Sequence, residues 1–194
     1  MPAAALTKTP AHHPSRVKAS SRPALGAQDV WNMAVNRRTA DRAVWRRAMQ
    51  TLVQRVMACD DVVLFEAVEM GVPTSMVDLI AGATNESVTR VLEVIGVAPT
   101  TFKRKDEAHE SLPDAAGQRV MGLLRVMATL QRALEESGDR EQVATFDLEA
   151  WLAQWLKEPL AELRNKTPAE MLRNSEGQRA LEQIIERMRG GLPA

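Results

Sequence analysis

Few side chains in this sequence have a type and spacing suited to catalysis. Cys59 is the only cysteine, and the acidic pair Asp60–Asp61 follows it directly. Neighbouring negative charges disfavour the thiolate, so this cysteine is a poor nucleophile. His109 lies in a charged stretch, Lys103 to Glu110, without a serine or cysteine in a plausible pairing. Because the carboxylates are scattered singly rather than paired as acid and base, we expect no catalytic site and no enzyme.

Metal and cofactor chemistry has equally little support. His12 and His13 are adjacent in a proline-rich segment, a weak metal pattern that is more typical of solvated tail residues. No glycine-rich phosphate loop follows a strand-like segment. The lone cysteine excludes a disulfide within the chain and fits a reducing cytoplasm. No apolar run of about 18 residues is present, so we expect no metal, no cofactor and no membrane-spanning segment.

The stretch from Glu86 to Lys105 contains residues suited to DNA binding. It predicts two short helices joined by Gly96-Val97-Ala98-Pro99, which is the spacing of a helix-turn-helix. Hydroxyl groups on the second helix would reach phosphates or base edges, and its cations would neutralise phosphates. Any two helices with a glycine between them give this pattern, so DNA binding and a plain helical pair both remain open. The candidate DNA-binding residues are Thr100, Thr101, Lys103, Arg104 and Lys105.

The charge is unevenly distributed along the chain. The net charge is zero, but the segment through Asp60 holds ten lysines and arginines against three acids. Such asymmetry indicates either a basic arm for a polyanionic or acidic partner, or simply a solvated basic tail. The first 26 residues hold four of the ten prolines, so we expect a flexible tail over residues 1–28.

The composition predicts an all-α fold. Hydrophobic residues make up 45%, aromatics only 4%, and the good helix formers are abundant. A chain of 194 residues supports one core or two small ones. Periodicity, capping residues and helix breakers predict eight helices. The first four run over Asp29–Cys59, from Thr74 or Ser75 to a break at Gly82–Asn85, over Glu86–Ile95 with Asn85 as its cap, and over Thr100–Asp106. The last four run from Pro113 to Gly138–Asp139, from the cap Asp147 to Pro159, from Pro168 to about Arg173, and from the cap Ser175 to Gly190.

The first of these helices is basic and amphipathic. One face carries the apolar residues and the arginines fall mostly elsewhere, so packing on the next domain is favoured over direct nucleic-acid binding. Together these segments predict a flexible basic tail (1–28), a basic amphipathic helical extension (29–70), a helix-turn-helix domain (71–138) and a small helical C-terminal domain (146–194). The apolar face consists of Trp45, Ala48, Met49, Leu52, Val53, Val56 and Met57.

Two parts of the sequence resemble the Xre/MbcA/ParS antitoxins. Gly71 to Ser75, the helix-turn-helix, Thr101 to Lys105 and Leu112 to Arg119 are similar to their Xre-like N-terminal domain. More specifically, Asn165 to Leu172, then Glu176-Gly177, then Ile184 to Gly191 resemble their toxin-binding domain. The chain departs from the family at Arg164-Asn165, where a glycine pair is common, and at Ala116 and Gly122, where glutamate and arginine are common. Asparagine tolerates a left-handed backbone, so the turn can survive.

This resemblance implies a bacterial cytoplasmic antitoxin of a type II toxin–antitoxin pair. Its partner would be a RES-domain toxin that consumes NAD or transfers NAD-derived groups, with its active-site cleft covered by the antitoxin's C-terminal helices and tail. The antitoxin would act as a homodimer within the hetero-oligomeric complex and would repress its own operon by binding operator DNA. The implied toxin-binding residues are Thr167, Pro168, Met171, Leu172, Arg187, Arg189, Gly190, Gly191 and Leu192.

Alternatives remain for the C-terminal part. Trp151 and Trp155 are either core residues or interface anchors, and the core accounts better for most of their surface. The last residues either insert into the toxin or fray as chain ends commonly do. A different class of function is a standalone helix-turn-helix regulator whose C-terminal domain only dimerises.

Overall fold

The computed structural model describes residues 25–33, 35, 40–136 and 146–189, and the regular elements within these ranges are helices, with no strand. This confirms the predicted all-α class. No helix in the described ranges is both long and apolar enough to cross a membrane. Residues 1–24 of the tail predicted over residues 1–28, and the helix stop at Gly138–Asp139, fall outside these ranges.

The N-terminal part forms three helices, α1 (Ala27–Val30), α2 (Arg42–Ala58) and α3 (Asp61–Glu69). The single helix predicted over Asp29–Cys59 is therefore wrong in its first third. Helix α2 begins only at Arg42, because the Asp41 carboxylate accepts a hydrogen bond from the Val44 amide at 2.9 Å and caps it. The predicted apolar face of α2 is confirmed, with five of its seven residues buried and Trp45 and Met57 partly buried. Helix α3 was not separately predicted.

The middle of the chain contains α4 (Ser75–Thr84), α5 (Val88–Ile95) and α6 (Pro99–Glu107). The predicted break at Gly82 is wrong, because α4 continues through it. The Trp45 ring of α2 lies directly against Gly82, where a Cβ atom would overlap it, so this glycine permits close packing. Asn85 adopts a left-handed conformation and ends α4 instead of capping α5, which Ser87 caps at the Arg90 amide.

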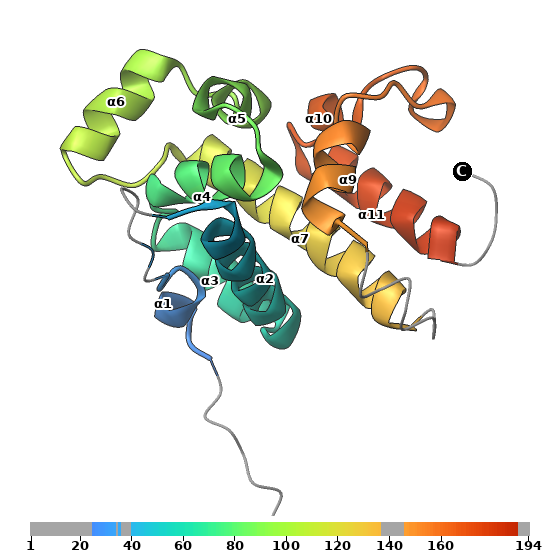
Figure 1. Cartoon of the computed structure of the whole chain (residues 1–194), viewed down its shortest axis with the longest axis horizontal. Coiled ribbons are helices and arrows are strands. Elements are labelled where there is room, and N and C mark those ends of the chain that lie inside the picture. Colours follow the sequence, from blue (N-terminus) through green and yellow to red (C-terminus); the bar gives the residue numbers. More distant parts are fainter. Residues whose placement is uncertain (1–24, 34, 36–39, 137–145, 190–194) are drawn as a thin grey trace, which may run out of the picture.

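The C-terminal part contains α7 (Asp114–Glu136), α9 (Leu148–Trp155), the 3-10 turn η1 (Ala161–Leu163), α10 (Pro168–Met171) and α11 (Ser175–Arg189). Helix α7 runs through the centre of the molecule, with α2, α3 and α5 packed along one part of it and α9 and α11 along another (Figure 1). The buried apolar side chains of all these helices form one continuous cluster. The predicted helix-turn-helix and toxin-binding segments thus share α7 as common support.

Candidate functional site

The start of α10 carries the Thr-Pro capping signal on which the predicted toxin-binding domain depended, and it forms a complete capping box. Thr167 caps the helix, because its hydroxyl accepts from the Glu170 amide at 3.3 Å while Glu170 Oε2 accepts from the Thr167 amide at 2.8 Å. Pro168 occupies the first helical position, where no amide hydrogen is needed. These reciprocal bonds confirm the predicted cap and fix the direction in which the chain enters α10. We refer to the turn before α10, α10 itself and the first turn of α11 as the C-terminal corner.

The cap also changes the pKa of Glu170, the acid that takes part in it. Hydrogen bonds from the Thr167 backbone, followed by those from its side chain, lower the pKa of Glu170 below its ordinary value. A carboxylate whose pKa is lower in the folded state stabilises the fold above its unfolded pKa. That contribution is lost as the pH falls through the folded value.

We therefore expect Glu170→Gln to flatten the acid limb of the stability–pH profile, in the range below about pH 4.3 where glutamates take up protons. The glutamine keeps a hydrogen-bond acceptor but has no charge to titrate. Thermal unfolding monitored by circular dichroism between neutral and acid pH would measure this. Glu158→Gln serves as the control and should leave the profile unchanged, because this exposed acid accepts from Gln154 alone among the described residues.

The turn before α10 holds two consecutive non-glycine residues in the left-handed conformation. Arg164 has a φ of 55° and Asn165 a φ of 61°, and the turn closes with a bridge between Leu160 and Lys166. The glycine pair of the related pattern is thus replaced without losing the turn, in line with the expectation for Asn165. Arg164 is the costlier residue, since a long side chain disfavours this backbone region.

Arg164→Gly is accordingly expected to stabilise the protein by about 0.5–1 kcal/mol, since relief of the left-handed strain exceeds the entropy that glycine adds to the unfolded chain. The exposed Arg173 does not have a positive φ, so Arg173→Gly should instead be neutral or destabilising. Paired urea titrations of the two variants would show the opposite signs. Destabilisation by both would contradict the strain at Arg164.

A close backbone contact sets the angle between α10 and α11. A Cβ atom on Gly177 would overlap the Met171 carbonyl oxygen, so only glycine fits there. The predicted cap at Ser175 is wrong by one residue, because Asn174 Oδ1 accepts from the Gly177 amide at 2.8 Å. Gln178 then donates through Nε2 to the Leu172 carbonyl at 3.0 Å. These bonds hold the first turn of α11 against the end of α10.

Helix α11 lies along α7 and buries Leu181, Ile184 and Ile185 against it. The two helices approach closely at Gly122 of α7, where an added Cβ atom would overlap the side-chain amide of Gln178. Gly122 is one of the positions at which the sequence departs from the related pattern. The arginine common there would displace Gln178 in this packing.

The predicted toxin-binding residues fall into three groups in the structure. Thr167 and Met171 are partly exposed, and the exposed Arg187 forms an ion pair with Glu162 at 3.4 Å. Pro168 and Leu172 are buried, Leu172 completely, so their side chains support the corner from inside. The Arg189 side chain and the remaining predicted contacts, Gly190, Gly191 and Leu192, lie outside the described residues.

Helix α6 stands out from the rest of the molecule and has no buried residue (Figure 1). Thr100, Lys103 and Arg104 are exposed, while Thr101 and Lys105 are partly buried. Its C-terminal end is fixed to α4, because the Thr74 hydroxyl donates to Asp106 Oδ1 at 2.8 Å instead of capping α4. The five predicted DNA-binding residues therefore lie together on an outward-facing helix.

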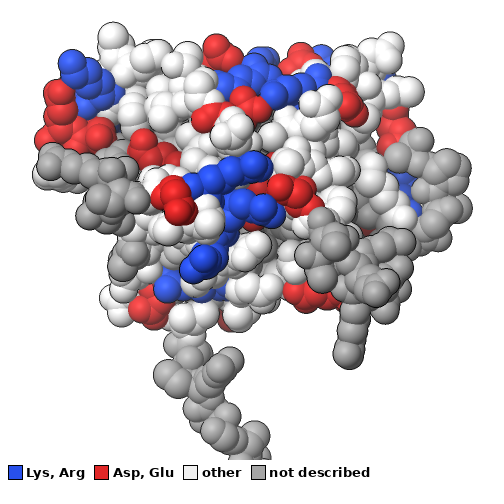
Figure 2. All heavy atoms as spheres, viewed as in Figure 1, with Lys and Arg blue, Asp and Glu red and all other residues white. Residues whose placement is uncertain are grey.

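Each of the three cations on α6 has an acid within ion-pair distance. Lys103 lies 3.9 Å from Glu107, while Arg104 and Lys105 lie 3.5 and 3.1 Å from Glu110. The hydrogen bond from Lys105 is the main reason that the pKa of Glu110 is below its ordinary value. Figure 2 likewise shows cations and acids interspersed over the visible face of the molecule. Phosphate binding at α6 would have to displace these internal partners.

A buried ion pair, which the sequence analysis missed, joins the basic helix α2 to the start of α9. Glu149 is only 1% exposed, and its carboxylate lies 3.2 Å from Arg46 Nε. Asp147, the cap of α9, also pairs with Arg46 at 3.2 Å and with Arg42 at 3.5 Å. This network fixes the predicted N-terminal extension to the C-terminal helices, and it agrees with the prediction that α2 packs on a neighbouring part of the fold.

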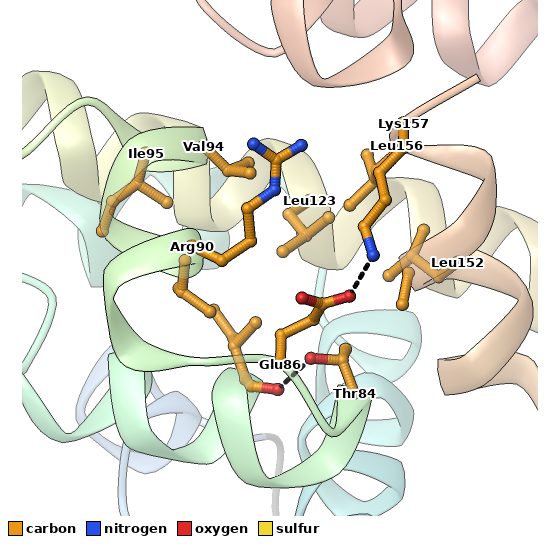
Figure 3. Close-up of a pocket in the computed structure, with 12 residues that line it drawn as sticks. Thr84, Glu86, Arg90, Val94, Ile95, Leu123, Leu152, Leu156 and Lys157 are labelled. Carbon is orange, nitrogen blue, oxygen red and sulfur yellow. Dashed lines mark hydrogen bonds and ion pairs between the residues drawn. The ribbon is translucent and has the colours of Figure 1, made fainter.

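A small apolar cavity lies between the helix-turn-helix segment and the C-terminal helices. It is lined by Val94 and Ile95 of α5, Leu123 of α7 and Leu152 of α9, with Arg90 at its rim (Figure 3). Across the opening, Lys157 forms an ion pair with Glu86 and so links the α4–α5 loop to the end of α9. This ion pair therefore connects the predicted helix-turn-helix domain (71–138) to the predicted C-terminal domain (146–194).

Metal-ligating side chains form no cluster within the described ranges, where no three histidine, cysteine, aspartate or glutamate side chains are placed to hold a metal ion. Burial, followed by the negative charge of Asp60, raises the pKa of the Cys59 thiol, in the direction expected from the sequence. The stacked rings of Trp151 and Trp155, 5.3 Å apart, are half-buried and buried respectively, which places most of their surface in the core.

Comparisons with known proteins agree with the C-terminal geometry. Residues 143–191 match the family model described as the antitoxin Xre/MbcA/ParS C-terminal toxin-binding domain, and this range contains α9, η1, α10 and α11. The Prs ADP-ribosylating antitoxin of Sphingobium sp. (strain YBL2) is 25% identical over 124 residues, which are 64% of this chain and 76% of that protein. In its capped C-terminal helices and in these likenesses, residues 143–191 of the chain are similar to the toxin-binding domain of the Xre/MbcA/ParS antitoxins.

Proposed function

We propose that this antitoxin neutralises a RES-domain toxin, an enzyme that consumes NAD or transfers groups derived from it. The match of residues 143–191 to a toxin-binding domain is the observation that carries the proposal. The name of the Sphingobium relative refers to ADP-ribosylation, a transfer that draws on NAD, and this chemistry fits a RES-type partner. The C-terminal helices cover the active-site cleft of the toxin.

The exposed side of the C-terminal corner is the contact surface. Arg164, Asn165 and Lys166 are exposed on the turn before α10, and Arg187 is exposed on α11. Arginines of this region, Arg187 or Arg189, suit a toxin site made for nucleotide phosphates, because a guanidinium binds phosphate through paired hydrogen bonds. Pro168 and Leu172 contribute indirectly, by holding this corner in shape.

Co-expression with the product of the adjacent gene would test the toxin partnership. We expect that product to arrest growth alone, to be harmless with this antitoxin, and to co-purify with it. Removing residues 190–194 should weaken neutralisation and leave DNA binding intact. A neighbouring product without toxicity, or an isolated gene, would instead favour the standalone regulator whose C-terminal domain dimerises.

We further propose that the antitoxin represses its own operon as a homodimer, through the helix pair α5–α6. The outward placement of α6, anchored at one end by Thr74, supports this. Two copies would present two α6 helices to a palindromic operator, as symmetric helix-turn-helix proteins do. Cations on α6 would exchange Glu107 and Glu110 for phosphates.

Operator binding is tested by the triple variant Lys103→Ala, Arg104→Ala, Lys105→Ala, which we expect to lose binding in a gel-shift titration. Glu110→Gln should do the opposite and strengthen binding, because it releases Arg104 and Lys105 from a competing carboxylate. Unchanged binding in the triple variant would move the DNA contact to the basic N-terminal segment.

A further inference from the structure

Helix α3 exposes an unusual amount of apolar surface. In the described ranges, four large apolar side chains are well exposed, and three of them belong to α3 or its C-cap. These are Val62, Phe65 and Met70, with exposed fractions of 64%, 63% and 61%. Clustered exposed apolar side chains mark surfaces that another segment or molecule covers.

The same helix is acidic and has no cation of its own. Residues 60–70 contain four acids and neither lysine nor arginine. Asp60 caps the helix at the Val63 amide, and Asp61 pairs with Arg125 of α7 at 2.9 Å. Glu66 and Glu69 are exposed and, among the described residues, have no ion-pair partner.

A groove continues this surface toward the C-terminal helices. Phe65 and Val68 of α3 form one side, Arg179 and Glu182 of α11 the other, and Met121 of α7 lies between them. Glu182 adds a further carboxyl group to this wall, and its burial raises its pKa. We refer to α3 and this groove together as the α3 surface.

We propose that residues 1–24 of this same chain bind the α3 surface. The segment carries four cations, Lys8, Arg16, Lys18 and Arg22, with no acid, and an apolar run from Ala3 to Leu6. Its charge thus complements the uncompensated Glu66 and Glu69, while its apolar end matches Phe65 and its neighbours. The proposal does not depend on the identity of the toxin or on DNA binding.

The place where the segment joins the fold favours this occupant. Helix α1 packs on α3, and Trp31 just beyond it donates from Nε1 to the Ala67 carbonyl of α3 at 2.7 Å (Figure 1). The chain that precedes α1 therefore starts beside the surface it is proposed to cover. Twenty-four residues span up to about 80 Å when extended, far more than the roughly 14 Å length of a nine-residue helix.

Two other occupants fit the charges less well. A second copy that brought its own α3 to the same place would set Glu66 and Glu69 against identical acids, because a two-fold contact pairs like surfaces. The toxin has its proposed contact at the turn before α10 and at Arg187, and α3 itself lies outside residues 143–191. Only the α11 wall of the groove, with Arg179 and Glu182, falls inside that range. A basic partner protein remains as an outcome that the experiment distinguishes.

Zero-length carbodiimide coupling of lysines to carboxylates in the purified full chain tests the contact directly. We expect mass spectrometry to find Lys8 or Lys18 joined to Glu66, Glu69 or Glu182. A mixture of ¹⁵N-labelled and unlabelled protein separates coupling within one chain from coupling between copies. Mixed-isotope links would overturn the proposal in favour of a second copy, and the absence of links to the α3 surface would overturn it altogether.

Tryptic cleavage after Lys8, Arg16 and Lys18 provides a second readout. We expect the double variant Glu66→Lys, Glu69→Lys to be cut about fivefold faster there, since losing roughly 1 kcal/mol of contact changes the bound fraction by this factor. Phe65→Ser should also speed cleavage. The matched pair Glu107→Lys, Glu158→Lys, at exposed acids outside the α3 surface, should not. Equal rates in wild type and both α3 variants, with circular dichroism unchanged, would refute the contact, even if a basic protein is captured by the same face.

Discussion

Replacing Arg46 with alanine should lower the free energy of unfolding by about 3 kcal/mol, because it leaves a buried carboxylate without its partner. Glu149 is almost fully buried and lies 3.2 Å from the Arg46 guanidinium, which is itself 30% exposed. Removing one member of a buried pair costs more than the pair contributes, since the remaining charge has lost its hydration as well. Urea titration followed by tryptophan fluorescence would measure the loss.

Arg47 provides the matched control, being the next residue on the same helix and exposed. Arg47→Ala is expected to change the stability by less than about 0.5 kcal/mol. The double variant Arg46→Met, Glu149→Leu should recover most of the loss, because apolar residues of similar volume can replace a buried pair. If Arg46→Ala and Arg47→Ala were equally mild, the pair would not hold α2 to α9.

Gly177→Ala should weaken toxin binding at least tenfold, which corresponds to about 1.4 kcal/mol. Its new methyl group would overlap the Met171 carbonyl oxygen, and no rotamer change relieves contact with a backbone atom. The first turn of α11 would have to move away from α10, which would displace Arg187 relative to the exposed turn at Arg164. Overpacking of this kind also typically costs about 1–3 kcal/mol of stability.

Affinity for the co-purified toxin, measured by titration calorimetry, is the direct measurement. Gly26→Ala is the control, because a Cβ atom there meets nothing closer than 3.5 Å. DNA binding through α6 should survive Gly177→Ala, since the corner contains no part of α5 or α6. Unaltered toxin affinity in a folded Gly177→Ala protein would place the docking surface away from the α10–α11 corner.

Local signals in the sequence predicted much of the helical framework. The caps at Asp147 and Thr167 and the proline that opens α6 were correct, because a cap is satisfied within one turn of its own helix. The helix-end residue Asn85 was identified, although its left-handed conformation ends α4 and does not start α5. Such features depend on residues only a few positions away, so they can be recognised from the sequence alone.

The errors arose where distant residues decide the local structure. Gly82 was predicted to break a helix, but it lies inside α4 because the Trp45 ring needs the space that a side chain would fill. The two residues are 37 positions apart in the sequence, so this contact cannot be recognised locally. Helix α3 has apolar residues on its exposed side as well as its buried one, so its pattern lacks a clear helical stripe.

The candidate site shows the same limit. The resemblance correctly indicated the C-terminal helices, but it could not separate buried Leu172 from exposed Arg187, since burial depends on how α10 packs on α11 and α11 on α7. Glu149 reads as a solvated acid in the sequence. Its partner Arg46 lies 103 residues away, and only the packing of α2 on α9 reveals the pair.

The shared helix α7 has a consequence for the lifetime of this antitoxin in the cell. Its side chains are covered by α2 and α3 on one part and by α11 on another, within one apolar cluster. A protease that trims the chain back to residue 138 would therefore uncover α7 and leave a fragment prone to unfold and be degraded further. The two activities proposed for this chain, repression of the operon and neutralisation of the toxin, would then end together, so the cell would hold either a complete antitoxin or none.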